Sequence, residues 1–302
     1  MFAIQCKNVK KRFSKGKSEV LALNDLSLSI ESGSTIALLG PNGSGKTTLM
    51  RSLCGLVEID SGEIQVFGHK VSATRSSQAR VGVVLEGNRG TYWRLTVAEN
   101  LAYFGTLKGI SKKDALAQGR VLLERFNMAD KMDATVQTLS RGMQQKLSIV
   151  VAMLGEPKLM ILDEPTLGLD ASSVEALKAM MNEASQQGSA LLLTTHQIDV
   201  AESLVEDVAL ISSGKIVKHG TVAEFAADYI DEHYTLSFEK PISDKSAAEI
   251  PIQNTVFDGR FVKHYGTRVE ELIYLLKDFG LVHARKEGVS LVKAYETALE
   301  RL

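Results

Sequence analysis

A glycine-rich loop at residues 40–48 constrains the fold of this chain more than any other stretch. The loop has the sequence GPNGSGKTT and directly follows the apolar run STIALL. Glycine loses more conformational entropy on folding than other residues, but it can adopt backbone conformations that they disfavour. The pattern G-x-x-x-x-G-K-[ST] runs from Gly40 to Thr47, between an apolar strand and a segment with helical spacing, which is the context that a phosphate-binding loop requires. The alternative is a flexible turn before a helix, in which the lysine and the threonine would have no purpose.

The residue types in this loop suit the binding of phosphates. Successive backbone N–H groups in a tight loop form a nest for an anion, and the following helix adds its free N–H groups and its positive end. Lys46 can reach the terminal phosphates of a nucleotide, and Thr47 can offer a hydroxyl to Mg²⁺. The predicted binding residues are Gly40, Pro41, Asn42, Gly43, Ser44, Gly45, Lys46, Thr47 and Thr48.

A second predicted strand ends in two carboxylates. In the stretch KLMILDEP, four apolar residues at 159–162 predict a strand buried on both faces. This strand delivers Asp163 and Glu164 to its carboxyl end, where ligands bind in open α/β sheets. We expect Asp163 to hold Mg²⁺, usually through water, and Glu164 to orient or deprotonate an attacking water. The alternative is a pair of solvated carboxylates before a loop, which the presence of the glycine loop makes less favoured.

Strands and helices alternate along most of the chain. This order predicts the α/β class, with a mostly parallel sheet covered on both faces. The stretch from about 95 to 155 has helical patterns only, and we expect it to form an inserted subdomain. Strands are predicted at 2–9, 20–30, 35–39, 62–68, 81–85, 159–162 and 190–194, with a hairpin at 208–220; helices are predicted from 46 to near 55 and at 96–109, 114–126, 172–187 and 197–205.

The chain changes character after residue 220. The stretch EKPISDKSAAEIP at 239–251 holds two of the five prolines and predicts a linker-like loop. Beyond it, residues 269–302 show a helix, strand and helix pattern, which is enough for a small α/β appendage.

Composition narrows the class of protein. A net charge of −1 over 302 residues gives no overall field toward nucleic acid, so we expect the basic stretch at 10–19 to be a solvated loop. Two cysteines are too few for a disulfide framework and suggest a reducing compartment. Apolar runs fall well short of the roughly 18 residues that cross a bilayer, and the first residues lack the apolar core of a signal peptide. We therefore expect a cytoplasmic protein that reaches any membrane through a partner.

The order of motifs along residues 1 to about 220 resembles the ATP-binding subunit of an ABC transporter. LSRGMQQKL at 139–147 resembles the family signature LSGGQ, about twenty residues before Asp163. TLGLD at 166–170 resembles the D-loop, and His196, at the end of LLLTTH, resembles the switch histidine. Phe13 matches the aromatic residue that stacks on adenine. These ordered motifs are far more specific together than the glycine loop alone.

The resemblance implies a P-loop NTPase fold: an ABC-type nucleotide-binding domain at 1–220, its helical subdomain at about 95–155, and a small C-terminal α/β accessory region at 221–302. It also implies an ATPase that converts ATP and water to ADP and phosphate, uses Mg²⁺, and works as a head-to-tail dimer, most simply a homodimer. The resemblance assigns Glu164, His196 and Lys46 to catalysis, Phe13 to adenine, Ser140, Gly142 and Met143 to ATP held by the opposite subunit, and Thr47, Glu86 and Asp163 to Mg²⁺.

Several of these assignments have alternatives when the residues are taken singly. Ser140 can cap a helix whose free N–H groups suit a phosphate, but an ordinary capped helix has the same pattern. His196 can donate to developing charge on the γ-phosphate, but a lone histidine is more often a buried side chain with its bonds satisfied. Phe13 can stack on adenine or belong to the core.

Three positions depart from the family pattern. Arg141 replaces the first glycine of the signature, and Met143 replaces its glutamine, so that a weakly accepting sulfur stands where an amide would be. In VVLEGNRGTYWRLT, at 83–96, Glu86 stands where the family has the glutamine of the Q-loop. A carboxylate is a competent Mg²⁺ ligand, and we expect Glu86 to keep the metal role and to tighten the dependence on Mg²⁺.

The same segment concentrates residues that are typical of interfaces. Arg89, Tyr92, Trp93 and Arg94 lie within six positions, and Trp93 is the only tryptophan. We expect the region Glu86–Thr96 to receive a cytoplasmic helix of a transmembrane transporter subunit. The alternative is an aromatic pair that closes the helical subdomain.

The sequence therefore predicts an ATPase subunit that powers transport, with export favoured over import. The LSRGM form, the single nucleotide-binding domain and the C-terminal appendage resemble separately encoded ATPases of exporters. Such a subunit lies on the inner face of the cell membrane through its partner. Two alternatives remain: a soluble ABC-type ATPase acting on ribosomes or DNA, and an ATP-sensing module that hydrolyses weakly. The transported substrate and the role of 221–302 are not encoded in any motif.

Overall fold

The computed structural model describes residues 1–15, 18–71, 81–85, 90–229, 233–265, 268–287 and 290–301. These residues divide into two units, Met1–Val222 and Ala223–Leu302. No helix within those ranges combines the length and the apolar character that crossing a membrane requires.

The centre of the first unit is a six-stranded sheet with the strand order β10-β9-β3-β8-β7-β6. Neighbouring strands are parallel except for β10, which pairs antiparallel with β9. Every residue of β3, β7 and β8 is buried because layers cover both faces of the sheet, which explains their uninterrupted apolar sequences. The strands are β3 (Thr35–Leu39), β6 (Val81–Val84), β7 (Leu159–Asp163), β8 (Ala190–Thr194), β9 (Asp207–Ser212) and β10 (Lys215–Thr221).

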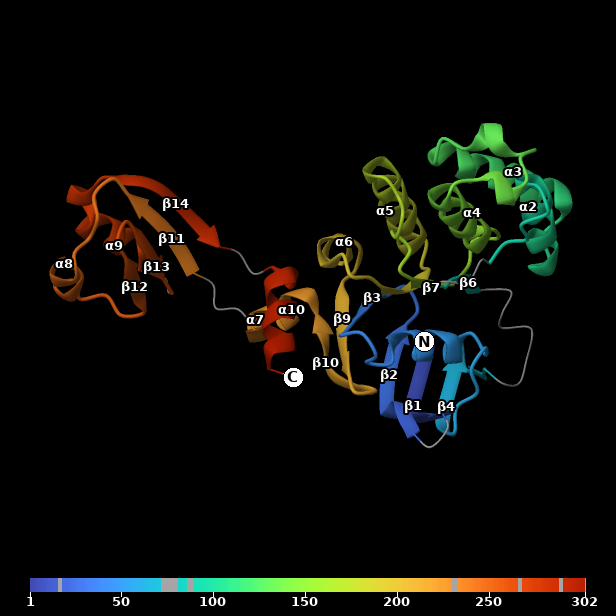
Figure 1. Cartoon of the computed structure of the whole chain (residues 1–302), viewed down its shortest axis with the longest axis horizontal. Coiled ribbons are helices and arrows are strands. Elements are labelled where there is room, and N and C mark those ends of the chain that lie inside the picture. The colour runs from blue at the N-terminus through green and yellow to red at the C-terminus, as the bar shows by residue number, and fades with distance from the viewer. Residues whose placement is uncertain are drawn as a thin grey trace. The chain divides into compact units, whose positions relative to one another are not determined.

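Helices cover one face of this sheet, and a second sheet lies on the other side (Figure 1). The helices are α5 (Ala171–Gln186) and α6 (Ile198–Leu204). On the other side, Leu49 and Met50 of α1 share one buried cluster with residues of both sheets. The second sheet is antiparallel, with the order β2-β1-β4-β5, and the sequence patterns do not predict it as a separate sheet. Its strands, with α1, are β1 (Phe2–Lys15), β2 (Ser18–Glu31), α1 (Lys46–Leu53), β4 (Ser61–Val66) and β5 (His69–Lys70).

The hairpin of β1 and β2 corrects the expectation of a solvated loop at residues 10–19. Both strands continue into this stretch. Ion pairs support it: Lys11 Nζ lies 2.9 Å from Asp60 Oδ1, and Arg12 NH1 lies 3.0 Å from Glu19 Oε2. A charged run can thus continue a strand when its charges find opposite partners beside it.

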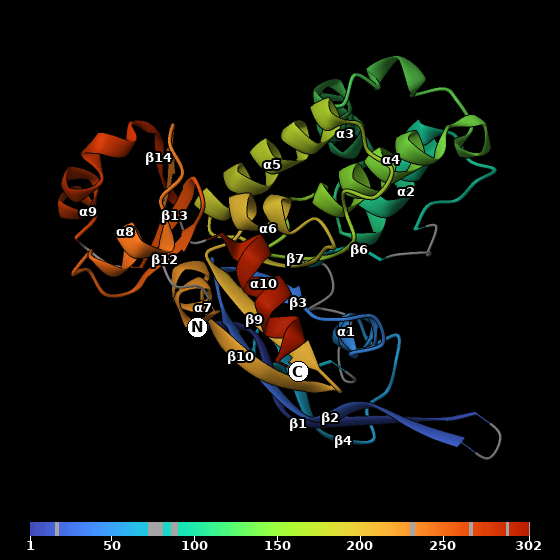
Figure 2. The ribbon, with the colours of Figure 1, turned by 60° about the vertical axis from the view of Figure 1, so that its left-hand side comes forward.

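Three helices between β6 and β7 form a helical subdomain (Figure 2). Each helix begins after a hydroxyl residue, Thr96, Ser111 or Ser140, whose side chain accepts a hydrogen bond from a backbone N–H group of the first turn. The ammonium group of Lys108 donates to three carbonyl groups at the end of the last helix and so caps it. The elements are α2 (Val97–Leu107), α3 (Lys112–Arg125), η2 (Ala129–Lys131), η3 (Val136–Thr138) and α4 (Arg141–Met153).

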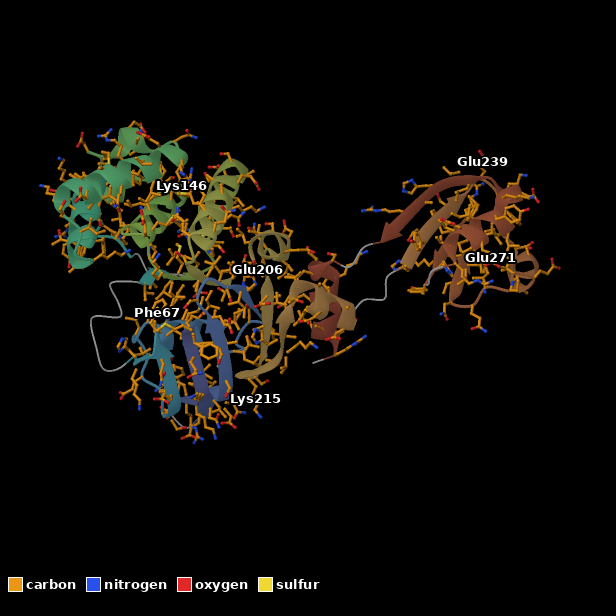
Figure 3. All side chains as sticks on the ribbon, turned by 180° about the vertical axis from the view of Figure 1, so that it is seen from behind. Phe67, Lys146, Glu206, Lys215, Glu239 and Glu271 are labelled. Atoms are coloured by element: carbon orange, nitrogen blue, oxygen red, sulfur yellow. The ribbon has the colours of Figure 1, made fainter. Side chains whose placement is uncertain are left out.

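The second unit is built on an antiparallel sheet with the order β12-β13-β11-β14. Leu236, Val262 and Leu272 are fully buried in its core, while charged side chains such as Glu239 and Glu271 lie at its surface (Figure 3). The elements from residue 222 on are α7 (Val222–Tyr229), β11 (His233–Phe238), α8 (Asp244–Ala248), β12 (Thr255–Asp258), β13 (Phe261–His264), α9 (Val269–Leu275), η4 (Lys277–Phe279), β14 (Leu281–Glu287) and α10 (Leu291–Glu300).

The predicted helix, strand and helix of the C-terminal region form as α9, β14 and α10. The expectation of a linker-like loop at 239–251 is wrong in part, because this stretch contains the helix α8. Strands β11, β12 and β13 are not predicted from the sequence. These strands are four to six residues long and mix polar with apolar residues, so that their alternation is too short to recognise.

Candidate functional site

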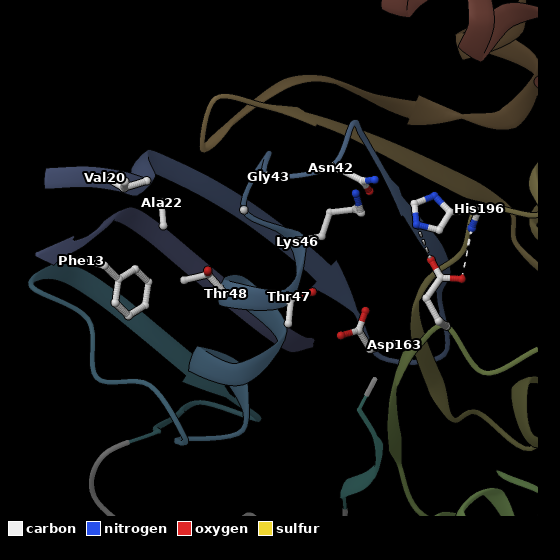
Figure 4. A pocket seen from close by; sticks show the side chains of 12 residues that line it. Phe13, Val20, Ala22, Asn42, Gly43, Lys46, Thr47, Thr48, Asp163 and His196 are labelled. Carbon is white, nitrogen blue, oxygen red and sulfur yellow. Dashed lines mark hydrogen bonds and ion pairs between the residues drawn. The ribbon is translucent and has the colours of Figure 1, made fainter. Parts of the chain in front are cut away.

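A pocket of about 310 Å³ lies between the glycine loop, the hairpin of β1 and β2, and the carboxyl end of β7 (Figure 4). Ten of the twelve lining residues are among those predicted from the sequence. Gly40, Pro41 and Ser44 belong to the same loop but do not line the pocket. The lining residues are Phe13, Val20, Ala22, Asn42, Gly43, Gly45, Lys46, Thr47, Thr48, Asp163, Glu164 and His196.

Two glycines of the loop are required by close backbone contacts. A Cβ atom at Gly45 would collide with the carbonyl oxygen of Ala22, and one at Gly40 would collide with that of Ile211. Gly45 also has a left-handed backbone, with φ at 112°. The loop therefore packs against β2 and β9 at a distance that only glycine permits, which fixes the path of its N–H groups.

The helix α1 follows the loop without a side-chain cap, and the side chain of Lys46 reaches back to the start of the loop. The residue before α1 is Gly45, which has no side chain to cap the first N–H groups of the helix. Lys46 Nζ donates to the carbonyl oxygens of Gly40 at 2.6 Å and Pro41 at 3.0 Å. Backbone N–H groups and an ammonium group thus converge on one side of the pocket, an arrangement that binds a phosphate chain.

Asp163 has the chemistry of a metal ligand. Its side chain is 2% exposed, and Oδ1 accepts a hydrogen bond of 2.5 Å from Thr194 Oγ1. Its second oxygen, Oδ2, is buried and has no hydrogen-bond partner among the described residues. A buried carboxylate oxygen in this position needs a cation or water. Thr47 lines the same pocket, so the two residues fit a Mg²⁺ ion that takes its remaining ligands from water and phosphate.

The residues near Asp163 and Thr47 favour a metal ion that is bound through oxygen atoms. No cluster of three histidine, cysteine or acidic side chains suited to a metal occurs in the part of the chain that the structure describes. Burial, with a smaller contribution from the charge of Asp163, raises the pKa of Cys54 to about 12. Cys54 also does not line the nucleotide pocket.

Glu164 is oriented by an unusual backbone conformation. Its φ is 52°, in the left-handed region that side-chain-bearing residues rarely adopt. Its backbone N–H donates to the carbonyl oxygen of Thr194 at 3.1 Å, and its carboxylate lies beside His196. The N–H of His196 donates to Glu164 Oε2 at 3.3 Å, and His196 Nε2 lies 3.4 Å from Oε1. Strain of this kind clusters at functional sites.

The predicted signature residues lie outside the pocket. Ser140, Gly142 and Met143 form the start of α4, where Ser140 Oγ accepts from the N–H of Met143 at 3.3 Å. A Cβ atom at Gly142 would come within 2.6 Å of the carbonyl oxygen of Gly168. The start of α4 therefore packs directly against the TLGLD segment, and the signature residues of this chain do not join its own pocket.

Side chains that the sequence analysis does not single out connect these elements. Gln145 Nε2 donates to the carbonyl oxygen of Pro165 at 3.1 Å, and Lys146 Nζ lies 3.1 Å from Asp170 Oδ2. Both lie within the LSRGMQQKL stretch, but no local pattern shows which residues they contact. Thr194, Val20 and Ala22 are also missed, because each is part of a strand whose pattern only predicts burial.

The aromatic segment is exposed and braced from within the subdomain. The side chains of Tyr92 and Trp93 are 49% and 42% exposed. Asn100 accepts from the N–H of Tyr92 at 2.7 Å and donates to its carbonyl oxygen at 3.1 Å. The ring of Tyr92 contacts that of Tyr103 edge-on, with centroids 4.9 Å apart. Glu86 and Arg89 lie outside the described residues.

Comparisons with known proteins agree with this geometry. A family model described as ABC transporter matches residues 23–167. The ABC transporter ATP-binding protein NatA of Bacillus subtilis (strain 168) is 35% identical over 213 residues, which are 70% of this chain and 87% of that protein. The Nod factor export ATP-binding protein I of Burkholderia lata is 37% identical over 72% of this chain and 70% of that protein. A solved structure described as the ATP binding subunit of an ABC transporter is 28% identical, with a TM-score of 0.68 over 75% of this chain and 93% of that one.

Proposed function

The chain belongs to the ABC transporter family as an ATP-binding subunit that hydrolyses ATP, and we propose that it powers export across a membrane through a separate transmembrane partner. The observation that carries the proposal is the pocket in which Lys46, Asp163, Glu164 and His196 meet the glycine loop. A loop that binds phosphates gains a metal ligand and a base there.

Each residue of the pocket has a role in our proposal. Lys46 and the loop N–H groups bind the phosphates of ATP, and Phe13 stacks on the adenine. Thr47 and Asp163 would hold Mg²⁺, which neutralises charge on the phosphates. Glu164 takes the proton of the attacking water as its oxygen bonds to the γ-phosphorus and the bond to ADP breaks. His196 orients the Glu164 carboxylate and donates to the charge that develops on the phosphate.

We propose a head-to-tail homodimer that binds two MgATP. Within the described residues, Ser140 provides the side-chain cap at the start of α4, and the other N–H groups of its first turn have no partner inside the helix. These groups and the adjoining Gly142 and Met143 cannot serve the pocket of their own chain, and they suit the ATP of a second copy. ATP would favour the closed pair, and hydrolysis would release it, because a ligand shifts such an equilibrium through its differential affinity.

The transmembrane partner would contact the region Glu86–Thr96. The exposed Tyr92 and Trp93 support this part of the proposal, because such aromatic side chains are typical interface anchors. One relative is described as a Nod factor export protein, which favours export. The subunit would then lie on the cytoplasmic face of the cell membrane, with Glu86 as an additional Mg²⁺ ligand. The membrane subunit would choose the substrate.

A pull-down tests the proposal. Tagged Glu164→Gln protein, incubated with MgATP and detergent-solubilised native membranes, should recover a multi-span membrane protein in stoichiometric amount. Lys46→Ala, which loses its phosphate contact, is the matched control and should recover less of it in the presence of ATP. Recovery of ribosomes, nucleic acid or no partner would overturn the transporter role and favour a soluble ATPase.

A further inference from the structure

A groove of about 430 Å³ opens between α3 of the helical subdomain and α5, and it shares no lining residue with the nucleotide pocket. Its volume lies within the range of sites that bind small molecules. It also lies where the helical subdomain meets the helices of the central sheet, and ligand sites favour such boundaries. Neither the hydrolysis of ATP nor the proposed membrane contact uses this groove.

Three methionines contribute to the apolar lining of the groove. Met153, Met160 and Met180 line it together with Ala117, Val121, Leu122, Pro157 and Ala184. Met160 and Met180 are each 1% exposed and form its floor. Methionine adapts its shape to a ligand and makes favourable contacts with aromatic rings. The floor therefore suits a flat aromatic group rather than a polar one.

Polar links hold the two walls of the groove at a fixed spacing. At the mouth, Arg125 NH1 of α3 lies 2.7 Å from Glu183 Oε2 of α5. Farther along α3, Gln118 Oε1 accepts a hydrogen bond of 3.2 Å from the N–H of Gly155, just after α4. Because these links join different elements across the groove, its width is built into the fold.

The charges around the mouth favour a cation. Arg125 and Glu183 neutralise each other. Glu156 also lines the groove, is exposed, and has no ion-pair partner within the described ranges. Its backbone is left-handed, with φ at 51°, which directs the chain sharply from α4 into β7 at the edge of the groove. The lining thus carries one carboxylate that no other lining side chain balances.

We propose that this groove binds a small aromatic cation, with its ring on the methionine floor and its positive charge beside Glu156. Such a ligand touches α3, the turn after α4, and α5 at once. It would therefore add to the links that Arg125 and Gln118 already make between these elements.

Fluorescence titration of the full chain tests this proposal with thioflavin T, an aromatic cation, as the probe. Saturable binding of one molecule per chain is expected, with much weaker binding of anilinonaphthalene sulfonate, an aromatic anion of similar size. Ala184→Trp should fill the groove and weaken thioflavin T binding more than tenfold, by analogy with a central interface contact. Glu156→Gln should weaken it by about fivefold, and added salt should reduce that difference, as for an exposed ion pair.

Matched variants separate the groove from the rest of the surface. Gln186→Trp places the same side chain elsewhere on α5, and Glu124→Gln removes a carboxylate from α3, but neither residue lines the groove. Both should bind thioflavin T as the wild type does. Equal binding by wild type and both groove variants would overturn the proposal, and so would preferential binding of the anionic dye. Because Glu156 is exposed, its variant remains informative even if Ala184→Trp does not fold.

Discussion

Both carboxylate oxygens of Glu164 face one residue, His196. The imidazole Nε2 lies 3.4 Å from Oε1, and the backbone N–H donates to Oε2 at 3.3 Å (Figure 4). The left-handed backbone of Glu164 places its side chain in this position, and the link to Thr194 keeps the turn in place. A carboxylate restrained in this way can accept a proton in one defined direction.

Replacement of this carboxylate by an amide tests its role. In Glu164→Gln the side chain keeps its shape but loses its basicity, so phosphate release should fall about 100-fold or more. ATP affinity should change little, because we assign the phosphate contacts to Lys46 and the loop. Malachite-green detection of phosphate and equilibrium binding of a fluorescent ATP analogue measure the two effects. Wild-type turnover in the variant would show that another group is the base.

Local chemistry made this centre predictable from the sequence. The glycine loop and the Asp163–Glu164 pair each follow an apolar strand within a few residues, so sequence order alone places them at one edge of a sheet. The contacts of Gln145 with Pro165 and of Lys146 with Asp170 join residues about twenty positions apart. Such contacts depend on how α4 packs, and no local pattern records them.

Phe13 is predicted to stabilise the bound base. It lines the pocket beside Val20, and its ring is 42% exposed, so a base can reach its face. Phe13→Ala should weaken the binding of a fluorescent ATP analogue about tenfold, since base stacking on an aromatic side chain contributes about 1–3 kcal/mol. Phe13→Tyr should retain binding. Phe2→Ala, which removes a similarly exposed ring from the same strand, serves as the control and should bind normally.

A buried histidine makes the second unit sensitive to acid. His264 is 2% exposed; its Nδ1 lies 3.0 Å from Thr255 Oγ1, while Nε2 has no hydrogen-bond partner among the described residues. Burial, with a smaller effect of the Arg268 charge, lowers the pKa of His264 below its usual 6.5. The folded unit thus binds this proton less tightly than the unfolded chain does. Its stability is full above pH 6.5 and falls as the pH drops from there toward the folded pKa.

Amide hydrogen exchange measures this effect. After correction for the intrinsic rate, amides of β12 and β13 should exchange faster at about pH 5.5 than at about pH 7.5, on either side of the unfolded histidine pKa. In His264→Gln this dependence should disappear. His283→Gln, at an exposed histidine of the same unit, should keep it. Equal acid sensitivity in both variants would assign the effect to other groups.

The second unit also contains strands that are too short to be predicted from the sequence. Strand β13 has only four residues. Val262 and His264 are buried, whereas Phe261 and Lys263 are exposed. An alternation this short occurs often by chance in loops. The hairpin of β1 and β2 has the opposite difficulty, because charged side chains such as Lys11 and Arg12 conceal a strand that ion pairs support.

Trp93 is predicted to anchor the transmembrane partner. Its indole is 42% exposed, whereas its carbonyl oxygen accepts a bond of 3.0 Å from the N–H of Gln137. Because Trp93→Ala leaves that backbone bond in place, the subdomain should stay folded while the partner is lost. Truncation of a central interface tryptophan costs 2 kcal/mol or more, equivalent to an affinity loss of about 30-fold. Co-purification from solubilised membranes should therefore fall, with ATP hydrolysis by the isolated subunit unchanged.

Tyr274→Ala, at an exposed aromatic of the second unit, is the control and should co-purify normally. Full recovery of the partner with Trp93→Ala would instead assign the aromatic segment to the closure of the helical subdomain.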